Sequence, residues 1–347
     1  MKSSSLMSRI RKQVILFWLL CILFILFEAP AFAELLDVES LLGLDKSQLA
    51  ELDKGRPIVY DLKEGSSDEL AVGLIWYFPV PLEKVVEKLW MQEPDMLDVD
   101  VIAHGILTEH SGMGALKSVI FSKDEARGLL EAEPGEEFNL SSHEFEKLKA
   151  FKHALKRVPQ RAIEDAASEY FREILLQRHD AYRREGINAI SPYMRKHGTE
   201  SKPAIELRQS AGESDILSRH FSGLLKEWLD YPKLLPAGAR EAFPWVEKSV
   251  EGRTAIILRH RITMDWNGGV LVLTREYYVP HSYNSSQWIT GGLPYREGTV
   301  VFQQVRSFTD QVMGTGSTLK HLVGRELLQD KMLKSFERLC DVLGRCN

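Results

Sequence analysis

The stretch IILRHRITMDWNGGVLVLTREYYV, residues 256–279, decides the fold because it places strand-forming residues on both sides of an Asn-Gly pair. Asn267-Gly268 is the preferred sequence of a two-residue type I′ turn, since both residues tolerate positive φ. A turn of fixed length also sets which residues face each other across the two strands. The sequence therefore predicts an antiparallel hairpin whose register runs outward from the turn to a pair formed by Leu258 and Tyr277.

The two faces of this hairpin differ in character. One face is apolar except for His260 and Arg275, which the register places opposite each other. On the other face Arg259 lies opposite Glu276, and such a pair of opposite charges is typical of a solvated surface. Two cationic groups in an apolar surface are costly unless they are paired or hydrated. Two interpretations stay open: a polar handle inside a hydrophobic cavity, or a pair that a nearby carboxylate satisfies or that lies at the open edge of the sheet.

Residues on both sides of the hairpin show the patterns of further strands and helices. Strand-forming residues predict strands over 57–62, 70–78, 101–107, 115–121, 243–250, 287–290 and 299–310. The pattern becomes helical from about residue 140, where Ser141 and Glu144 form a capping box. Helical spacing predicts a block of three helices over residues 141–230 and a long C-terminal helix from Leu319 to Leu343.

This order of elements resembles the START-like (Bet v 1-like, SRPBCC) helix-grip superfamily. The resemblance is carried by Leu70–Leu89, Ala255–Val279 and Thr299–Leu343, where the run Val305-Arg-Ser-Phe-Thr-Asp310 precedes a glycine and an amphipathic helix. It implies an α+β fold in which a curved antiparallel sheet grips the C-terminal helix and leaves an apolar cavity. Members of the superfamily mostly bind lipids, sterols or other hydrophobic molecules, and some are enzymes. Residues 141–230 depart from the small members and are expected to form a helical insertion.

The N-terminus has the three parts of a secretory signal peptide. Basic residues precede the apolar run from Val14 to Phe27, and an Ala-Phe-Ala sequence ends at Ala33. This run is shorter than the roughly 20 residues that a membrane-spanning helix needs. We expect cleavage after Ala33, which removes residues 1–33 and leaves residues 34–347 as a helix-grip domain in the periplasm or outside the cell. An uncleaved membrane anchor is the alternative.

Charge and cysteine content limit the possible partners. Residues 1–33 contain four basic side chains and one acidic one, so their removal changes the net charge from −5 to −8. An acidic chain without a basic stripe is unsuited to nucleic acid, and it has little bulk attraction for anionic lipid, so membrane contact is expected to be transient at most. Cys340 and Cys346 remain near the C-terminus, where they could close a small loop or stay free.

The candidate ligand-binding residues are His260, Arg275, Tyr277, Arg306 and Asp310. Arg306 and Asp310 are four residues apart on one expected strand and so share a face, which allows an ion pair. If that face lines the cavity, the Arg306 guanidinium could meet a ligand carboxylate or phosphate. No metal motif stands out, and neither a cofactor nor a catalytic residue is assigned.

These observations lead to one hypothesis and two alternatives. The hypothesis is an exported binding protein that holds a hydrophobic or amphipathic, lipid-like molecule between the sheet and the C-terminal helix. The first alternative is a hydrolase- or cyclase-type enzyme that uses the same cavity, with His260 or His281 as general base, although neither has a visible nucleophile beside it. The second alternative is a non-catalytic envelope interaction module that presents residues 141–230 to a partner.

Overall fold

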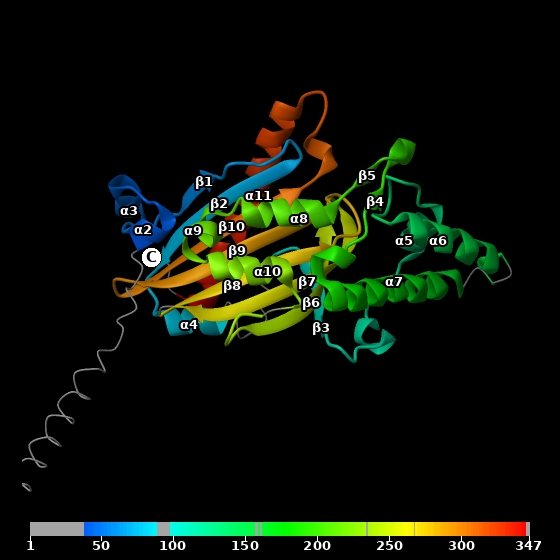
Figure 1. The fold of residues 1–347 in the computed structure, drawn as a ribbon, viewed down its shortest axis with the longest axis horizontal. Helices are drawn as coiled ribbons and strands as arrows, with labels where there is room; N and C mark the ends of the chain where they lie inside the picture. The colour runs from blue at the N-terminus through cyan, green and yellow to red at the C-terminus, as the bar shows by residue number, and fades with distance from the viewer. Residues whose placement is uncertain are drawn as a thin grey trace, which may run out of the picture. The chain divides into compact units, whose positions relative to one another are not determined.

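An eight-stranded antiparallel sheet forms the centre of an α+β fold (Figure 1). The structure is a computed structural model, and it describes residues 38–88, 98–156, 159, 162–233, 235–266 and 268–344. The expected signal peptide and Asn267 of the expected turn therefore lie outside the described residues.

The strand order in the sheet is β1-β2-β10-β9-β8-β7-β6-β3. The strands are β1 (Ile58–Asp61), β2 (Glu69–Phe78), β3 (Val101–Leu107), β6 (Arg240–Val250), β7 (Arg253–Trp266), β8 (Gly269–Tyr278), β9 (Ser285–Tyr295) and β10 (Gly298–Phe308). A separate two-stranded sheet pairs β4 (Tyr193–Met194) with β5 (Glu200–Ser201). Since β2 pairs with β10, the first and last long strands of the chain are neighbours.

Helices precede, interrupt and follow the sheet. They are α2 (Val38–Leu42), α3 (Lys46–Leu52), α4 (Leu82–Val86), α5 (Lys123–Glu131), α6 (Ser142–Leu155), α7 (Ile163–Glu185), α8 (Pro203–Gly212), α9 (Asp215–His220), α10 (Ser222–Asp230) and α11 (Ser317–Leu343). The capping box that the sequence predicts at Ser141 is present, because its hydroxyl accepts from the Glu144 backbone N–H. No helix within the described ranges has both the length and the apolar character of a membrane span.

One predicted strand is wrong. Residues 115–121 form the end of a 3-10 helix (Met113–Leu116) and a loop, and the capping box of Ser122 and Glu125 then opens α5. The apolar side chains of this segment pack against α7 instead of extending the sheet, and the Phe121 backbone N–H donates to Ser168 Oγ at 2.9 Å. The helical insertion therefore begins earlier than residue 141 and contains α5 and α8 in addition to the predicted helices.

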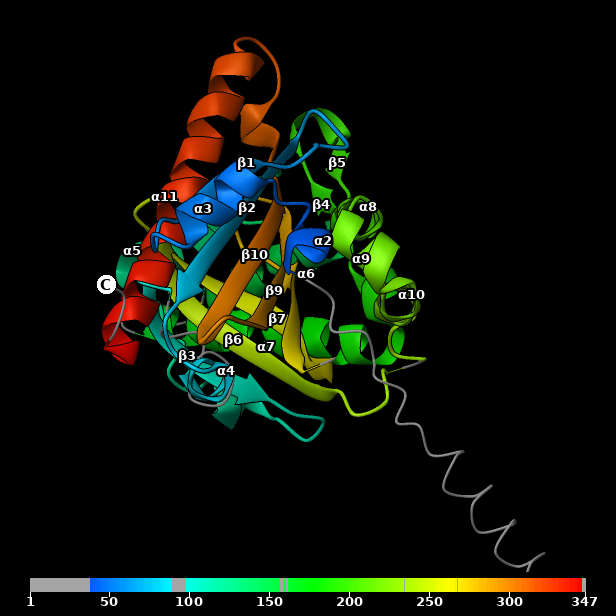
Figure 2. The same cartoon turned by 90° about the vertical axis from the view of Figure 1, so that its left-hand side faces the viewer.

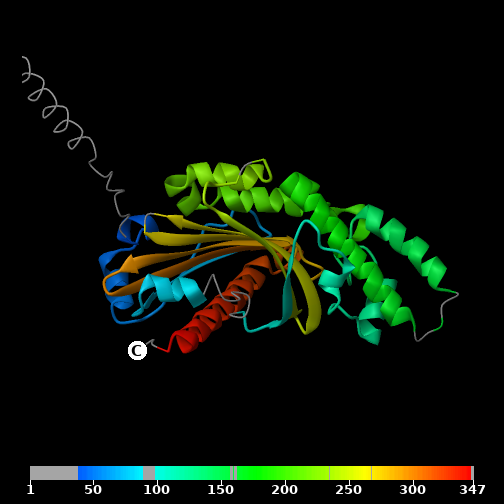
Figure 3. The ribbon, with the colours of Figure 1, turned by 90° about the horizontal axis from the view of Figure 1, so that it is seen from below.

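The two faces of the curved sheet carry different layers (Figure 3). α11 and α4 lie on one face, here called the α11 face, and α7, α8 and α10 lie on the opposite face, here called the block face. α11 packs mainly on β2, where Phe336 stacks on Trp76 with ring centroids 6.4 Å apart (Figure 2). The predicted α+β class, a sheet gripping a C-terminal helix with a helical insertion, is thus confirmed.

Only the second half of α11 is buried along its apolar side. Met332, Phe336 and Leu339 pack on the sheet. The apolar side chains of the first half are exposed instead: Leu319, Leu322, Val323 and Leu327. The sheet therefore covers only part of the apolar side of α11.

The hairpin register is confirmed near the turn and broken farther out. Trp266 pairs with Gly269 and His260 pairs with Arg275, as predicted, but Leu258 pairs with Tyr278 instead of Tyr277. The register shift is a β-bulge, which leaves Tyr277 as the additional residue of β8. Both tyrosine side chains consequently belong to the core beneath the helical block, whereas strict alternation would place them on opposite faces.

The face that carries Arg259 and Glu276 is buried, so the prediction of a solvated surface is wrong there. Arg259 is 3% and Glu276 is 2% exposed, and Arg259 Nε donates to Glu276 Oε1 at 3.0 Å. The Tyr283 hydroxyl donates to the second carboxylate oxygen at 2.7 Å. The pair therefore forms part of a polar interior on the α11 face of the sheet.

Candidate functional site

Four of the five predicted site residues lie on the block face. His260, Arg275 and Tyr277 contact groups of α7 and α10, and Arg306 donates to the Glu213 carbonyl just after α8. The register places His260 opposite Arg275, Arg275 opposite Gln287 and Gln287 opposite Arg306, so these side chains form a row across four strands. They are thus separated by the sheet from α11, whereas the prediction placed them between the sheet and that helix.

A chain of contacts connects buried Arg275 to the partly exposed carboxylate of Glu241. Arg275 Nη1 donates to the Tyr182 hydroxyl at 2.9 Å, and that hydroxyl lies 3.0 Å from His260 Nδ1. His260 Nε2 lies 3.0 Å from Glu241 Oε1. A guanidinium only donates, so the Tyr182 oxygen accepts from it and its proton is assigned to His260 Nδ1. The proton of the neutral imidazole is then on Nε2, which lies near the carboxylate without forming a hydrogen bond to it.

This arrangement explains how a buried guanidinium without an adjacent carboxylate is tolerated. Arg275 is completely buried and has no carboxylate partner among the described residues; its other contacts are the Trp228 carbonyl at 3.2 Å and the Trp228 ring, 4.0 Å away. Burial lowers the pKa of His260 to about 4, so the ring is neutral near pH 7. Arg275 is therefore held by two neutral acceptors, the Tyr182 hydroxyl and the Trp228 carbonyl, and by the face of the Trp228 ring.

Tyr277 takes part in a second contact with α7. Its ring stacks on Tyr182 with centroids 4.1 Å apart, and its hydroxyl lies 3.0 Å from His179 Nδ1. Burial is the main cause that raises the pKa of Tyr277 well above its ordinary value. The phenol therefore remains protonated, and the bulge of β8 serves to direct it at the helix.

Arg306 and Asp310 do not pair with each other, contrary to the ion pair that their spacing allows. Arg306 Nη1 donates to Glu69 Oε1 at 2.7 Å, and both side chains are buried. Asp310 lies beyond the end of β10, in a 3-10 helix (Asp310–Val312), where Arg195 Nε donates to its Oδ2 at 2.6 Å. The end of the strand therefore removes Asp310 from the face that carries Arg306.

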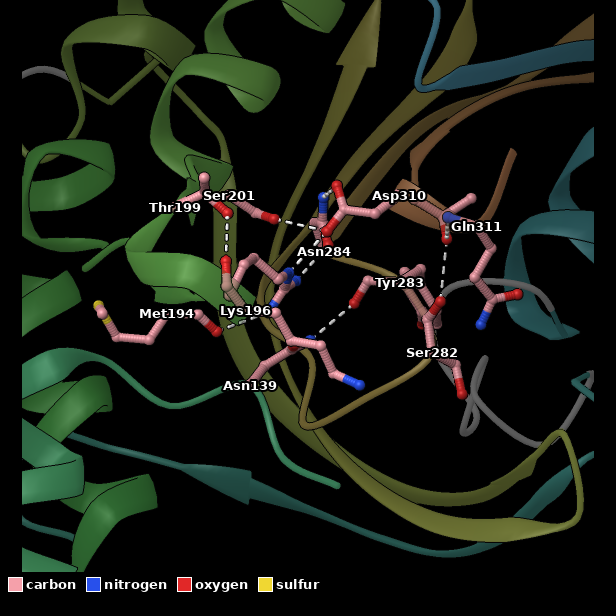
Figure 4. A network of polar contacts seen from close by, with 12 residues as sticks. Asn139, Met194, Lys196, Thr199, Ser201, Ser282, Tyr283, Asn284, Asp310 and Gln311 are labelled. Carbon is pink, nitrogen blue, oxygen red and sulfur yellow. Dashed lines mark hydrogen bonds and ion pairs between the residues drawn. The ribbon is translucent and has the colours of Figure 1, made fainter. Parts of the chain in front are cut away.

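Asp310 belongs to a network that joins the β4–β5 hairpin to the start of β9 (Figure 4). Ser201 Oγ donates to Asp310 Oδ2 at 2.7 Å, and Asn284 Nδ2 lies 3.2 Å from Asp310 Oδ1. The same Asn284 nitrogen donates to Glu206 Oε1 at 3.0 Å, and Ser285 Oγ donates to Glu206 Oε2 at 2.6 Å. Two carboxylates thus share one amide group.

Glu206 has a strongly shifted pKa. Burial is the main cause that raises the pKa of Glu206 to about 7, and the neighbouring carboxylates Asp68 and Asp310 act in the same direction. The hydrogen bonds from Ser285 and Asn284 act in the opposite direction. Asp310 has Arg195 as its cation, whereas no ion pair of Glu206 occurs within the part of the chain that the structure describes. Glu206 therefore changes its charge near neutral pH at the contact between α8 and the sheet.

An open groove lies on the α11 face of the sheet. It lies between α4 and the tip of the β7–β8 hairpin and has a volume of about 470 Å³. Its described lining is Leu82, Glu83, Val86, Asp265, Trp266, Gly268, Gly269 and Val270. A second groove of about 280 Å³ lies on the helical block between α6 and residues 132–134. Neither lining contains a residue of the Glu241–His260–Tyr182–Arg275 chain.

The sequence did not predict this groove, because its two sides come from distant segments of the chain. The Asn-Gly turn correctly locates the hairpin tip, and α4 begins directly after Pro81. The local sequence pattern does not indicate that the hairpin tip and α4 are in contact, because the two segments are far apart in the sequence. Tyr182 was recognisable as part of an apolar helix face, but its role as the partner of His260 depends on packing between α7 and β7.

The remaining observations identify neither a metal centre nor a relative. The described residues contain no group of three or more His, Cys, Asp or Glu side chains arranged to hold a metal ion. Comparisons with protein-family models, with curated proteins and with solved structures gave no match for this chain.

Proposed function

We propose that this chain is an exported binding protein of the START-like type that holds one amphipathic small molecule. The observation that carries the proposal is the groove of about 470 Å³ between α4 and the β7–β8 hairpin. Pockets that hold a single small molecule have volumes of about 300–1,000 Å³. α4, which forms one side of the groove, lies on the same face of the sheet as α11 (Figure 3), and helix-grip proteins use this face for ligands.

The lining supports an amphipathic ligand. Leu82, Val86 and Val270 offer apolar surface, and Asp265 and Glu83 add polar groups. The row of His260, Arg275 and Arg306 is a weaker candidate, since protein groups already occupy most of its donors.

Calorimetric titration of the delipidated mature protein with decyl maltoside, below its micelle concentration, tests the proposal. We expect one-to-one binding that Val86→Trp abolishes by filling the groove. Ile205→Trp, which adds the same indole to an exposed site on α8, is the matched control and should bind normally. Absence of uptake, or equal uptake by Val86→Trp, would overturn the proposal.

Export is supported by the basic, apolar and Ala-Phe-Ala parts of residues 1–33. Expression of the full chain in a bacterium with a periplasm, followed by mass measurement of the periplasmic fraction, tests it. The expected species begins at Glu34. A full-length mass in the membrane fraction would instead identify an uncleaved anchor.

A further inference from the structure

The exposed apolar residues in the first half of α11 point away from the sheet. Four side chains, here called the α11 stripe, are 65%, 54%, 45% and 61% exposed and share one side of the helix: Leu319, Leu322, Val323 and Leu327. Buried His321 comes two residues after Leu319, about 200° further round the helix. This half of α11 also projects beyond the strands in two views (Figures 1 and 2), so a partner can reach the stripe.

The stripe is large enough to bind a second copy of the chain weakly. Together with Met313, which is 38% exposed, it presents roughly 400 Å² of apolar surface, within the range of patches that mark interaction sites on monomers. Two such patches with their polar rims would bury about 1,000 Å², the lower limit for a specific interface.

The charges around the stripe do not favour a lipid surface. Arg325 and Lys331 are already in ion pairs with carboxylates at the end of β1 and just before β3, at 3.2 and 2.7 Å. Glu326 and Asp330 are exposed, and helical spacing places both on the side of α11 that carries the stripe. Anionic headgroups would therefore meet acidic groups there.

The N-terminus of α11 has a positive end without a compensating group. The helix begins after Gly316, where no side chain of the described residues caps it, and its first turn contains no acidic residue. A helix N-terminus has partial positive charge and favours a nearby carboxylate. Asp330 has an exposed and therefore weak ion pair with Lys334, at 2.6 Å, so its carboxylate can also serve a partner.

We propose that α11 forms a symmetric dimer contact, in which the stripes of two copies pack antiparallel about a two-fold axis at Val323. Leu319 of each copy then faces Leu327 of the other, since both are four residues from the axis. Gly316 and Asp330 are both seven residues from Val323, so each Asp330 lies at the uncapped N-terminus of the other copy's α11. A parallel pairing would instead bring the two Asp330 carboxylates together. The inference is independent of ligand binding in the groove.

Sedimentation velocity of the mature protein, at concentrations from about 1 to 200 µM, tests the dimer. We expect a monomer–dimer equilibrium with a Kd of about 10 µM, because the interface is small. Leu319→Gln/Leu327→Gln should raise this Kd about a hundredfold, since each change occurs twice in a symmetric contact. Ile205→Gln/Leu235→Gln alters two exposed apolar residues elsewhere and should leave the Kd unchanged. A protein that stays monomeric throughout, or equal effects of the two double variants, would overturn the inference.

A charge variant tests the antiparallel arrangement. Asp330→Asn should raise the dimer Kd about three- to tenfold, because it removes a carboxylate from two helix N-termini. Glu337→Gln is the matched control, since this exposed residue lies on the same side of α11 but two turns beyond the contact, and its Kd should not change. Equal Kd values for the two variants would contradict the arrangement.

Oxidative cross-linking locates the two-fold axis. The two copies of residue 323 meet in the proposed dimer, whereas those of residue 327 lie about 12 Å apart along the helices. Val323→Cys should therefore form a covalent dimer in much higher yield than Leu327→Cys, and equal yields would overturn the proposed axis.

Co-sedimentation with phosphatidylglycerol vesicles addresses lipid as the occupant of the stripe. The mature protein should remain in the supernatant. Binding to the vesicles that Leu319→Gln/Leu327→Gln abolishes would replace the dimer contact by docking on a lipid surface.

Discussion

The Tyr182 hydroxyl lies 3.0 Å from His260 Nδ1 and accepts from Arg275 at 2.9 Å, so one phenol on α7 connects two opposite residues of β7 and β8. All three side chains are buried. Removal of one partner from such a contact leaves a buried polar or charged group without compensation, which costs more than the contact itself contributes.

Tyr182→Phe is therefore expected to lower the free energy of unfolding by about 2–4 kcal/mol, because it leaves Arg275 with one fewer acceptor. Urea denaturation measures the change. Tyr170→Phe on the same helix is the matched control, since the Tyr170 hydroxyl is buried without a hydrogen bond, and its expected change is below about 0.5 kcal/mol. Equal effects of the two variants would show that Arg275 does not depend on Tyr182.

His260 predicts a loss of stability toward acid. Its pKa in the folded protein is lowered to about 4 from 6.5, so the unfolded chain takes up a proton first as the pH falls. The contribution of His260 to the free energy of unfolding is therefore fully present above about pH 6.5, and it falls by roughly 3 kcal/mol as the pH drops to 4. Denaturation curves of His260→Asn at several pH values should show a smaller slope in this window. A slope equal to that of the unaltered protein would mean that His260 is protonated when folded.

Glu206 predicts a pH dependence of opposite sign. Its pKa is raised to about 7 from 4.5, so the folded protein keeps the proton after the unfolded chain has lost it. The contribution of Glu206 to the free energy of unfolding is therefore fully present below about pH 4.5, and it declines by roughly 3 kcal/mol as the pH rises to 7. Glu206→Gln should be more stable than the unaltered protein above pH 7 and similar to it near pH 4. Destabilisation of this variant at every pH would contradict the raised pKa.

The buried pair of Arg306 and Glu69 predicts a large effect of a small substitution. Glu69→Gln leaves a buried guanidinium without its carboxylate, and we expect a loss of about 3 kcal/mol in thermal or urea unfolding. Asp61→Asn provides the comparison, because Asp61 pairs with Arg325 at 3.2 Å at an exposed site, where a loss below about 1 kcal/mol is expected. Similar losses for both variants would show that burial does not set the strength of these pairs.

Local signals in the sequence were reliable where a few neighbouring residues determine the structure. The Asn-Gly pair gave the correct register from Trp266 to Arg259, and the capping box at Ser141 marked the start of α6. The class of the fold followed from the order of such elements. The segment 115–121 was predicted as a strand because its composition suits one, whereas its apolar side chains pack on a helix that lies later in the chain.

The sequence by itself determined that His260 lies opposite Arg275, because turn length and the two-residue period of a strand are local properties. Only the tertiary structure decided what satisfies them: Tyr182 lies 78 residues from His260 and 93 residues from Arg275 along the chain. The bulge at Tyr277 has the same origin, since it directs two consecutive tyrosines into a core completed by α7. Hydrogen bonding and burial of side chains depend on packing between distant segments. A periodic sequence pattern does not indicate which distant segments pack together.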